Sequence, residues 1–189
     1  MFALLALFSV VANAESFEVS DYTAAPLQVQ LAAQLDAPPA EVFDLVSTGL
    51  SEWMDVSEIT WDNEDSATHG QIDDGSSRSC ALGGKKGLTE TIPYWEDDHL
   101  YAYQMDWDNS DFKLPLRGQL GTFEVSPDGD GGTVLVWSQY FERKVHPMSP
   151  MIPGFMRKKM GQGLDTLIGM TGGEVIDPAD AEIAVAAAE

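Results

Sequence analysis

The segment HPMSPMIPGFMRKKMGQGLDTLIGMTGG, residues 146–173, has the pattern of one long amphipathic helix. Gly172 and Gly173 suit its end, because glycine readily adopts the left-handed conformation in which many helices terminate. One face of this helix is expected to be buried. Its large apolar side chains recur three or four residues apart, the spacing of a single helical stripe: Ile152, Phe155, Met156, Met160, Leu164, Leu167 and Ile168.

The 87 residues before this helix, 58–144, have the pattern of strands and turns only. The sequences GGKKG, WEDDH and SPDGDGG are rich in residues that favour turns. Strands joined by such short connections pair antiparallel. The expected strands cover residues 58–63, 76–82, 87–95, 99–108, 118–126 and 132–143.

The part of the chain before residue 58 adds one strand and two short helices. Residues 26–37, PLQVQLAAQLDA, alternate apolar and polar side chains, which predicts a strand. Pro38 and Pro39 mark the start of a helix, and residues 48–55, TGLSEWMD, predict a second one. Because strands twist, a sheet of about seven strands must curl, and the long helix is the obvious filler of its concave face. The sequence thus predicts an α+β fold with an apolar pocket between sheet and helix.

Two charged residues lie on the apolar side of the adjacent strands in GSSRSCALGGKKGLTETIPYW, residues 75–95. Two interpretations stay open. Arg78 and Glu90 could neutralise each other as a structural pair. Alternatively, they could anchor the polar end of a ligand, with Arg78 holding an oxygen and Glu90 or Tyr103 moving a proton. The side chains that share the apolar phase are Arg78, Cys80, Leu82, Leu88, Glu90, Ile92 and Tyr94.

The composition excludes several classes of function. The chain of 189 residues carries 31 acidic and 10 basic residues, a formal net charge of −21, so its surface is expected to repel nucleic acid and anionic lipid headgroups. The single cysteine, Cys80, permits no internal disulfide and has the pattern of a small buried hydrophobe. The three histidines lack the spacing of metal ligands. We therefore expect no nucleic-acid partner, no metal and no cofactor.

Residues 1–14, MFALLALFSVVANA, have the features of a secretory signal peptide. An apolar run from Phe2 to Ala12 leads into the small-x-small sequence Ala12-Asn13-Ala14. The run is shorter than the roughly 20 residues that span a bilayer, so stable membrane insertion is not expected. No Lys or Arg precedes the run, which leaves a buried first element, a misplaced start codon and a cytoplasmic location as alternatives to a periplasmic or secreted protein.

We predict cleavage after Ala14, because small residues at positions 12 and 14 suit signal peptidase. Sequencing the N-terminus of protein from the native host checks this. Mature protein that still begins at Met1 would contradict secretion by this route.

The whole set of segments resembles the START-like (SRPBCC-type) superfamily of helix-grip proteins, which includes polyketide cyclases/dehydrases, lipid-transport proteins and the birch pollen allergen. The resemblance covers residues 24–172 and leaves 173–189 as an acidic, alanine-rich tail that we expect to be mobile. In the bacterial cyclase/dehydrase-like group, an Arg in the third strand, a Glu in the fourth and a Trp in the seventh recur; Arg78, Glu90 and Trp137 stand at these places. The segments that carry the resemblance are LDAPPAEVFDLVS, Trp53, GSSRSCAL, GLTETI, YAYQMDW, GTFEVSPDGDGGTVLVWSQYF and the final helix.

The resemblance implies a hydrophobic cavity but not one reaction. Three functions remain open: a carrier or sensor of a hydrophobic or amphipathic small molecule, a cyclase or dehydratase-like enzyme, and a partner-binding protein whose cavity is filled by side chains. The oligomeric state is left open as well. The expected polar cluster is Arg78, Glu90 and Tyr103, and the expected lining is Tyr101, Met105, Trp107, Trp137, Phe155, Met156 and Met160.

Overall fold

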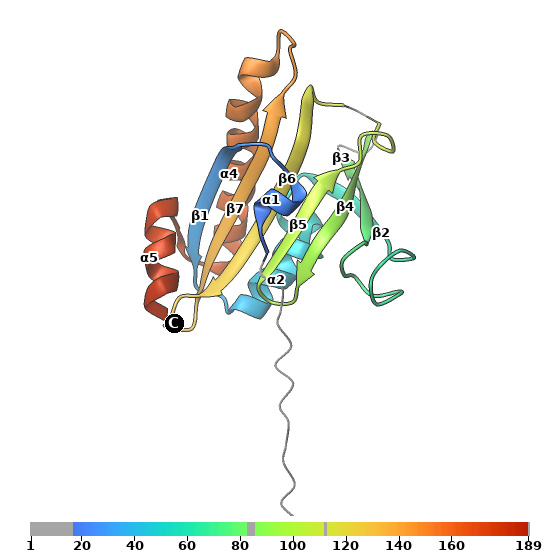
Figure 1. Cartoon of the computed structure of the whole chain (residues 1–189). Coiled ribbons are helices and arrows are strands. Elements are labelled where there is room, and N and C mark those ends of the chain that lie inside the picture. The colour runs from blue at the N-terminus through green and yellow to red at the C-terminus, as the bar shows by residue number, and fades with distance from the viewer. Residues whose placement is uncertain (1–16, 83–85, 112, 189) are drawn as a thin grey trace, which may run out of the picture.

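One curled antiparallel sheet and one long helix make up most of the protein (Figure 1). The structure is a computed structural model that describes residues 17–82, 86–111 and 113–188. The expected signal peptide, residues 1–14, and residues 83–85 of the GGKKG turn lie outside the described residues. In chain order, the elements are α1 (Val19–Tyr22), β1 (Leu27–Leu35), α2 (Pro39–Ser47), α3 (Leu50–Trp53), β2 (Val56–Asp62), β3 (Ser77–Leu82), β4 (Lys86–Glu96), β5 (Leu100–Met105), β6 (Leu116–Pro127), β7 (Thr133–Arg143), the 3₁₀ turn η1 (Ser149–Met151), α4 (Ile152–Thr171), β8 (Glu174–Ile176) and α5 (Pro178–Ala188).

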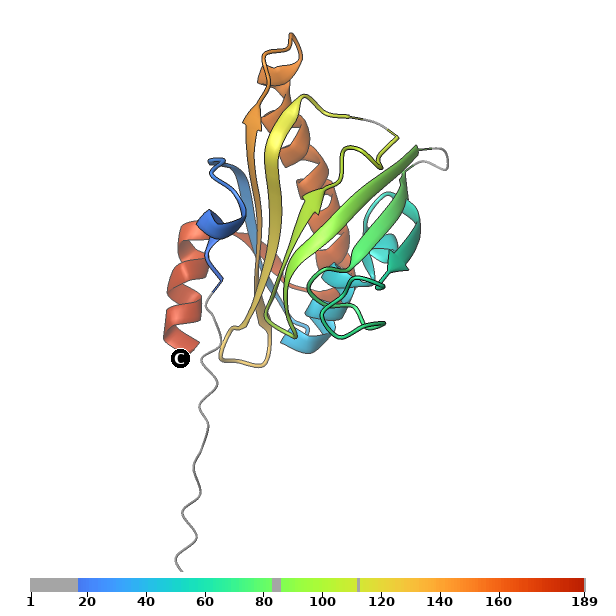
Figure 2. The same cartoon turned by 45° about the vertical axis from the view of Figure 1, so that its right-hand side comes forward.

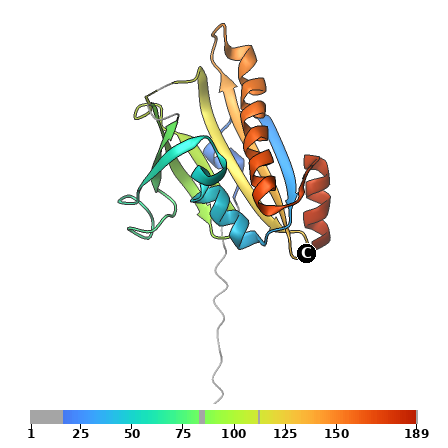
Figure 3. The ribbon, with the colours of Figure 1, turned by 180° about the vertical axis from the view of Figure 1, so that it is seen from behind.

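The eight strands follow the order β2-β3-β4-β5-β6-β7-β1-β8. The five successive hairpins from β2 to β7 pair neighbours in sequence, and β1 then closes against β7. Figures 2 and 3 show α4 lying along the concave face of this sheet, with α2 at one end. The helix-grip architecture expected from the sequence is therefore confirmed, with a short eighth strand in addition.

The core lies between the concave face and the helices. Leu164 and Leu167 of α4 are fully buried there, together with Phe43 of α2 and Trp53 of α3. Gly163 lets α4 approach α3 closely, because a Cβ atom at this position would lie 2.9 Å from the Trp53 ring. No helix within the described part of the chain is long and apolar enough to cross a bilayer.

A β-bulge near the end of β4 makes the expected inward orientation of Tyr94 wrong. The register between β4 and β5 shifts between Thr91 and Tyr94. An extra residue in one strand reverses which side chains face the core. Tyr94 therefore lies on the outer face, where its ring contacts Phe17, and Trp95 packs inward against Phe43.

The tail, which we expect from its composition to be mobile, contains a short strand and a helix. β8 pairs with β1 at the edge of the sheet, and α5 lies against the outer face of the sheet (Figure 1). Ala181 of α5 is fully buried beside Ala32 and Val134. Small side chains allow this close packing, so an alanine-rich sequence that lacks an obvious amphipathic stripe still forms a docked helix.

Candidate ligand cavity

A cavity of about 390 Å³ lies between the concave face of the sheet and α4. This volume is within the range of small-molecule sites, so the cavity is not filled by side chains. Its polar lining consists of Asp55, Arg78, Glu90, Tyr103, Gln139 and Lys159. Its apolar lining consists of Leu50, Met54, Val56, Cys80, Leu82, Leu88, Met105, Leu114, Phe123, Trp137, Phe155, Met156 and Met160.

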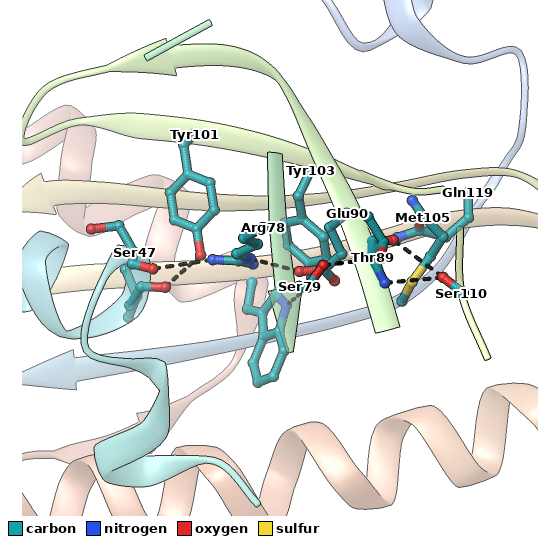
Figure 4. A network of polar contacts seen from close by, with 12 residues as sticks. Ser47, Arg78, Ser79, Thr89, Glu90, Tyr101, Tyr103, Met105, Ser110 and Gln119 are labelled. Atoms are coloured by element: carbon teal, nitrogen blue, oxygen red, sulfur yellow. Dashed lines mark hydrogen bonds and ion pairs between the residues drawn. The ribbon is translucent and has the colours of Figure 1, made fainter. Parts of the chain in front are cut away.

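Arg78 and Glu90 form a buried ion pair in the cavity wall (Figure 4). The two residues face each other across β3 and β4, and Arg78 Nε donates to Glu90 Oε2 over 2.7 Å. Arg78 Nη1 also donates to the carbonyl of Ser47 over 3.1 Å. Burial disfavours the arginine's charge, but the carboxylate of Glu90 outweighs this effect, so the pKa of Arg78 is raised. Arg78 therefore stays charged, and the pair neutralises itself within the wall.

Tyr103 is the end of a chain of oriented hydrogen bonds. The backbone N–H of Met105 donates to Gln119 Oε1, so Gln119 must present its Nε2 to Gln139 Oε1, at 3.1 Å. Gln139 in turn must present its own Nε2 to the Tyr103 hydroxyl. The indole N–H of Trp137 donates to the same oxygen over 3.0 Å.

Both contacts of the Tyr103 hydroxyl therefore use its oxygen as acceptor. No group in the described part of the chain accepts its proton. Burial, reinforced by the charge of Glu90, raises the pKa of Tyr103, so the phenol keeps this proton at neutral pH. Tyr103, which lines the cavity, therefore has an O–H donor that none of the described protein groups uses.

The Tyr103 ring is positioned by a glycine on the neighbouring strand. Gly121 faces Tyr103 across β5 and β6, and a Cβ atom at Gly121 would lie 2.2 Å from Tyr103 Cζ. Any larger residue would displace the ring. The phenol thus lies flat on the sheet and reaches its two donors on β7.

The structure brings most of the expected site residues together. The full polar cluster and five of the seven expected lining residues border the cavity, namely Arg78, Glu90, Tyr103, Met105, Trp137, Phe155, Met156 and Met160.

Two expected lining residues do not reach the cavity. Tyr101 is fully buried in an aromatic cluster with Phe43 and Phe123, and its hydroxyl donates to the carbonyl of Val46, because α2 covers this part of the sheet. Trp107 packs instead on a second cluster around Phe141. Strand β5 ends at Met105, so the alternation that placed Trp107 inward no longer holds there.

Sequence reasoning missed Gln139, Gln119, Asp55 and Lys159. Gln139 lies on the buried side of β7, two residues after Trp137. A polar residue at a position where the alternation predicts an apolar one could have indicated a place in the cavity wall. Gln119 had no such signal, because the register of β6 shifts between Arg117 and Leu120.

Cys80 also borders the cavity, beside the ion pair. Burial raises the pKa of its thiol to about 11, with the charge of Glu90 as a further cause. The thiol is therefore neutral at physiological pH and contributes apolar surface, as its position in the strand pattern predicted.

The curled sheet, the gripping helix and the apolar cavity between them define a helix-grip domain of the START-like class. Residues 26–168 match the family model of polyketide cyclase / dehydrase and lipid transport, and the chain belongs to this family. No protein of curated function matches the chain.

Solved structures share the fold at low sequence identity. A START superfamily protein from Mycobacterium smegmatis is 14% identical, with a TM-score of 0.60 over 76% of this chain and 95% of that one. Norcoclaurine synthase from Thalictrum flavum, solved with dopamine and hydroxybenzaldehyde, is 12% identical, with a TM-score of 0.56 over 87% and 96% of the two chains. The Aha1 dimer of Colwellia psychrerythraea is 13% identical, with a TM-score of 0.55 over 74% and 91%. At these identities the likeness concerns the fold alone.

Proposed function

We propose that this protein binds a hydrophobic or amphipathic small molecule in the cavity and acts as its carrier or sensor in the periplasm or outside the cell. The cavity itself carries the proposal: it is large enough for a small molecule and almost entirely apolar, and its charged pair is already neutralised. The assignment outside the cytoplasm rests on the signal-peptide pattern of residues 1–14.

The hydrogen bonds of the wall support a particular kind of ligand. Arg78 is engaged by Glu90 and by the Ser47 carbonyl, so it offers little to a ligand carboxylate. Tyr103 offers its proton instead. The matching ligand is neutral at its inner end and carries an acceptor oxygen such as that of a ketone, an aldehyde or an ester.

The same geometry favours binding over catalysis by the Arg78, Glu90 and Tyr103 cluster. A general base must be free to take a proton from the substrate. Glu90 is held by Arg78, and the raised pKa of Tyr103 makes this phenol a poor proton donor in a reaction. The cluster is better suited to positioning a ligand than to transferring a proton.

We expect wild-type protein to bind 4-phenyl-2-butanone, and Tyr103→Phe to bind it about 2–10-fold more weakly. The substitution removes one neutral hydrogen bond, whose net contribution is about 0.5–1.5 kcal/mol. Isopentylbenzene has the same shape without the oxygen, so its affinity should be the same for both proteins. Isothermal titration calorimetry measures all four dissociation constants.

Tyr94→Phe is the matched control, because this phenol lies on the outer face, where it donates to Glu96. Tyr94→Phe should leave the affinities for 4-phenyl-2-butanone and for isopentylbenzene unchanged. Equal loss of both ligands in Tyr103→Phe would mean that the phenol supports the cavity's shape and does not contact the ligand oxygen. Failure of wild-type protein to bind either compound, together with no small molecule co-purifying from the native host by mass spectrometry, would overturn the proposed function.

A further inference from the structure

The basic residues of this acidic protein are concentrated in one region, residues 143–159, which we call the basic tip. It holds five of the ten basic residues and no acidic one, whereas the rest of the chain carries five bases against 31 acids. The net charge predicts repulsion of anionic surfaces everywhere, and the tip is a local exception. Its basic residues are Arg143, Lys144, Arg157, Lys158 and Lys159.

The same region exposes apolar side chains. Val145, Met148, Met151 and Phe155 are each more than half exposed. Met148 caps the start of η1, Met151 ends η1 and Phe155 lies in the first turn of α4, so the three are spaced three and four residues apart along the start of this helical segment. Exposed apolar side chains clustered in this way mark an interaction surface.

The backbone of the tip is held in place, so these side chains are not exposed by a loose loop. Ser149 is buried, and its hydroxyl donates to the carbonyl of Lys144. Ile152 is buried against Leu116 and Phe141 of the sheet. In Figures 1 and 2 the end of β7 and the start of α4 extend together past the neighbouring strands. The tip is therefore an anchored projection that presents apolar and basic side chains together.

We propose that the basic tip docks this protein onto the surface of a lipid bilayer that contains anionic lipid. Apolar side chains flanked by Lys and Arg suit the boundary between headgroups and acyl chains. Four of the five cations, Arg143, Lys144, Arg157 and Lys158, form no ion pair with any residue the structure describes. The acidic body does not prevent docking, because charges beyond about 8–10 Å are largely screened at physiological salt.

The tip adjoins the cavity mouth. Phe155 belongs to the tip and lines the cavity, and so does Lys159, whose Nζ lies 4.0 Å from Asp55 Oδ2. Docking therefore places the cavity mouth at the membrane surface, where an apolar molecule can enter or leave without crossing water. The docking itself depends on the tip and not on what the cavity holds.

Flotation of the full chain with vesicles tests the proposal. The protein should float with vesicles of phosphatidylcholine containing 30% phosphatidylglycerol in 50 mM NaCl, less in 500 mM NaCl, and little with phosphatidylcholine alone. Arg157→Gln with Lys158→Gln should lower the partition coefficient about 10–30-fold, since each basic residue near an anionic surface contributes about a factor of five. Met151→Ser with Phe155→Ser should also lower it, by about tenfold or more.

Each variant has a matched control. Thr166→Glu with Gly169→Glu makes the same change in net charge on the exposed side of α4, away from the tip. Ile183→Ser removes an equally exposed apolar side chain from α5. Neither control should alter flotation.

Failure of the wild-type protein to float with anionic vesicles would overturn the proposal, as would equal losses in variants and controls. Concentration-dependent self-association in sedimentation velocity, abolished by the tip variants and without vesicle binding, would overturn it by assigning the tip to a second copy of the chain.

Discussion

Arg78→Met is expected to destabilise the protein by about 3–5 kcal/mol. The substitution leaves the Glu90 carboxylate without its partner in an apolar wall, and this uncompensated charge is the main cost. Glu90→Gln should cost a similar amount, because it strands a guanidinium that is 2% exposed. The double variant should recover much of the loss, since no buried charge remains. Urea denaturation of the four proteins gives the coupling energy.

Two further variants isolate the cause. Arg117 pairs with Glu142 at 3.1 Å, but both side chains are at least half exposed, so Arg117→Met should cost less than about 1 kcal/mol. Arg78→Lys keeps the charge but loses the planar fork that contacts both Glu90 and Ser47, and should fall in between. Single changes below about 1 kcal/mol, with no coupling, would show that water in the cavity already solvates the two charges. They would then be available to a ligand, and the anchoring interpretation from the sequence would be the better one.

Leu164→Ala is expected to destabilise the protein by about 2–5 kcal/mol. Leu164 is 1% exposed, in the centre of the interface between α4 and the sheet. Truncation there removes apolar contacts and leaves a void, and the penalty depends on how far the site can collapse. The close approach at Gly163 holds α4 against Trp53, so we expect little collapse and a cost in the upper part of the range.

Met170→Ala on the same helix is the control. Met170 is 46% exposed, and its loss should change the free energy of unfolding by less than about 1 kcal/mol. Equal effects of the two substitutions in urea denaturation would mean that α4 does not depend on its inward face for stability.

The sequence supported more of the fold than of the site. Strand and helix patterns depend on periodicity along a few residues, which is why the elements from β1 to α4 could be predicted in order. The placement of Arg78 and Glu90 on the inner face also followed from alternation alone. A bulge broke this reasoning at Tyr94, because one extra residue inverts the phase. Pro93, at the register shift, was the usable signal, since proline inside a strand is typical of a bulge or an edge.

The tail and the cavity show a second limit of prediction from the sequence, which is that burial depends on distant elements. α5 has no clear amphipathic stripe, and its alanines give little hydrophobic signal, yet the surface presented by β1 and β7 receives it. Alternation along β5 places Tyr101 and Tyr103 on the same face of the strand. However, α2 covers Tyr101 and leaves Tyr103 lining the cavity. What covers a side chain depends on elements distant in sequence.

The sequence by itself determined the order of strands and helices and the inward pair of opposite charges, because these follow from local periodicity; its resemblance to the START-like superfamily supplied the family. Only the tertiary structure decided that this pair is closed and that the free donor is Tyr103, since Gln119 and Gln139 orient one another across three strands. It also decided that the methionines near the basic residues of 143–159 are exposed and that this segment adjoins the cavity. Their clustering can be read from the sequence, but exposure depends on which elements cover a side chain.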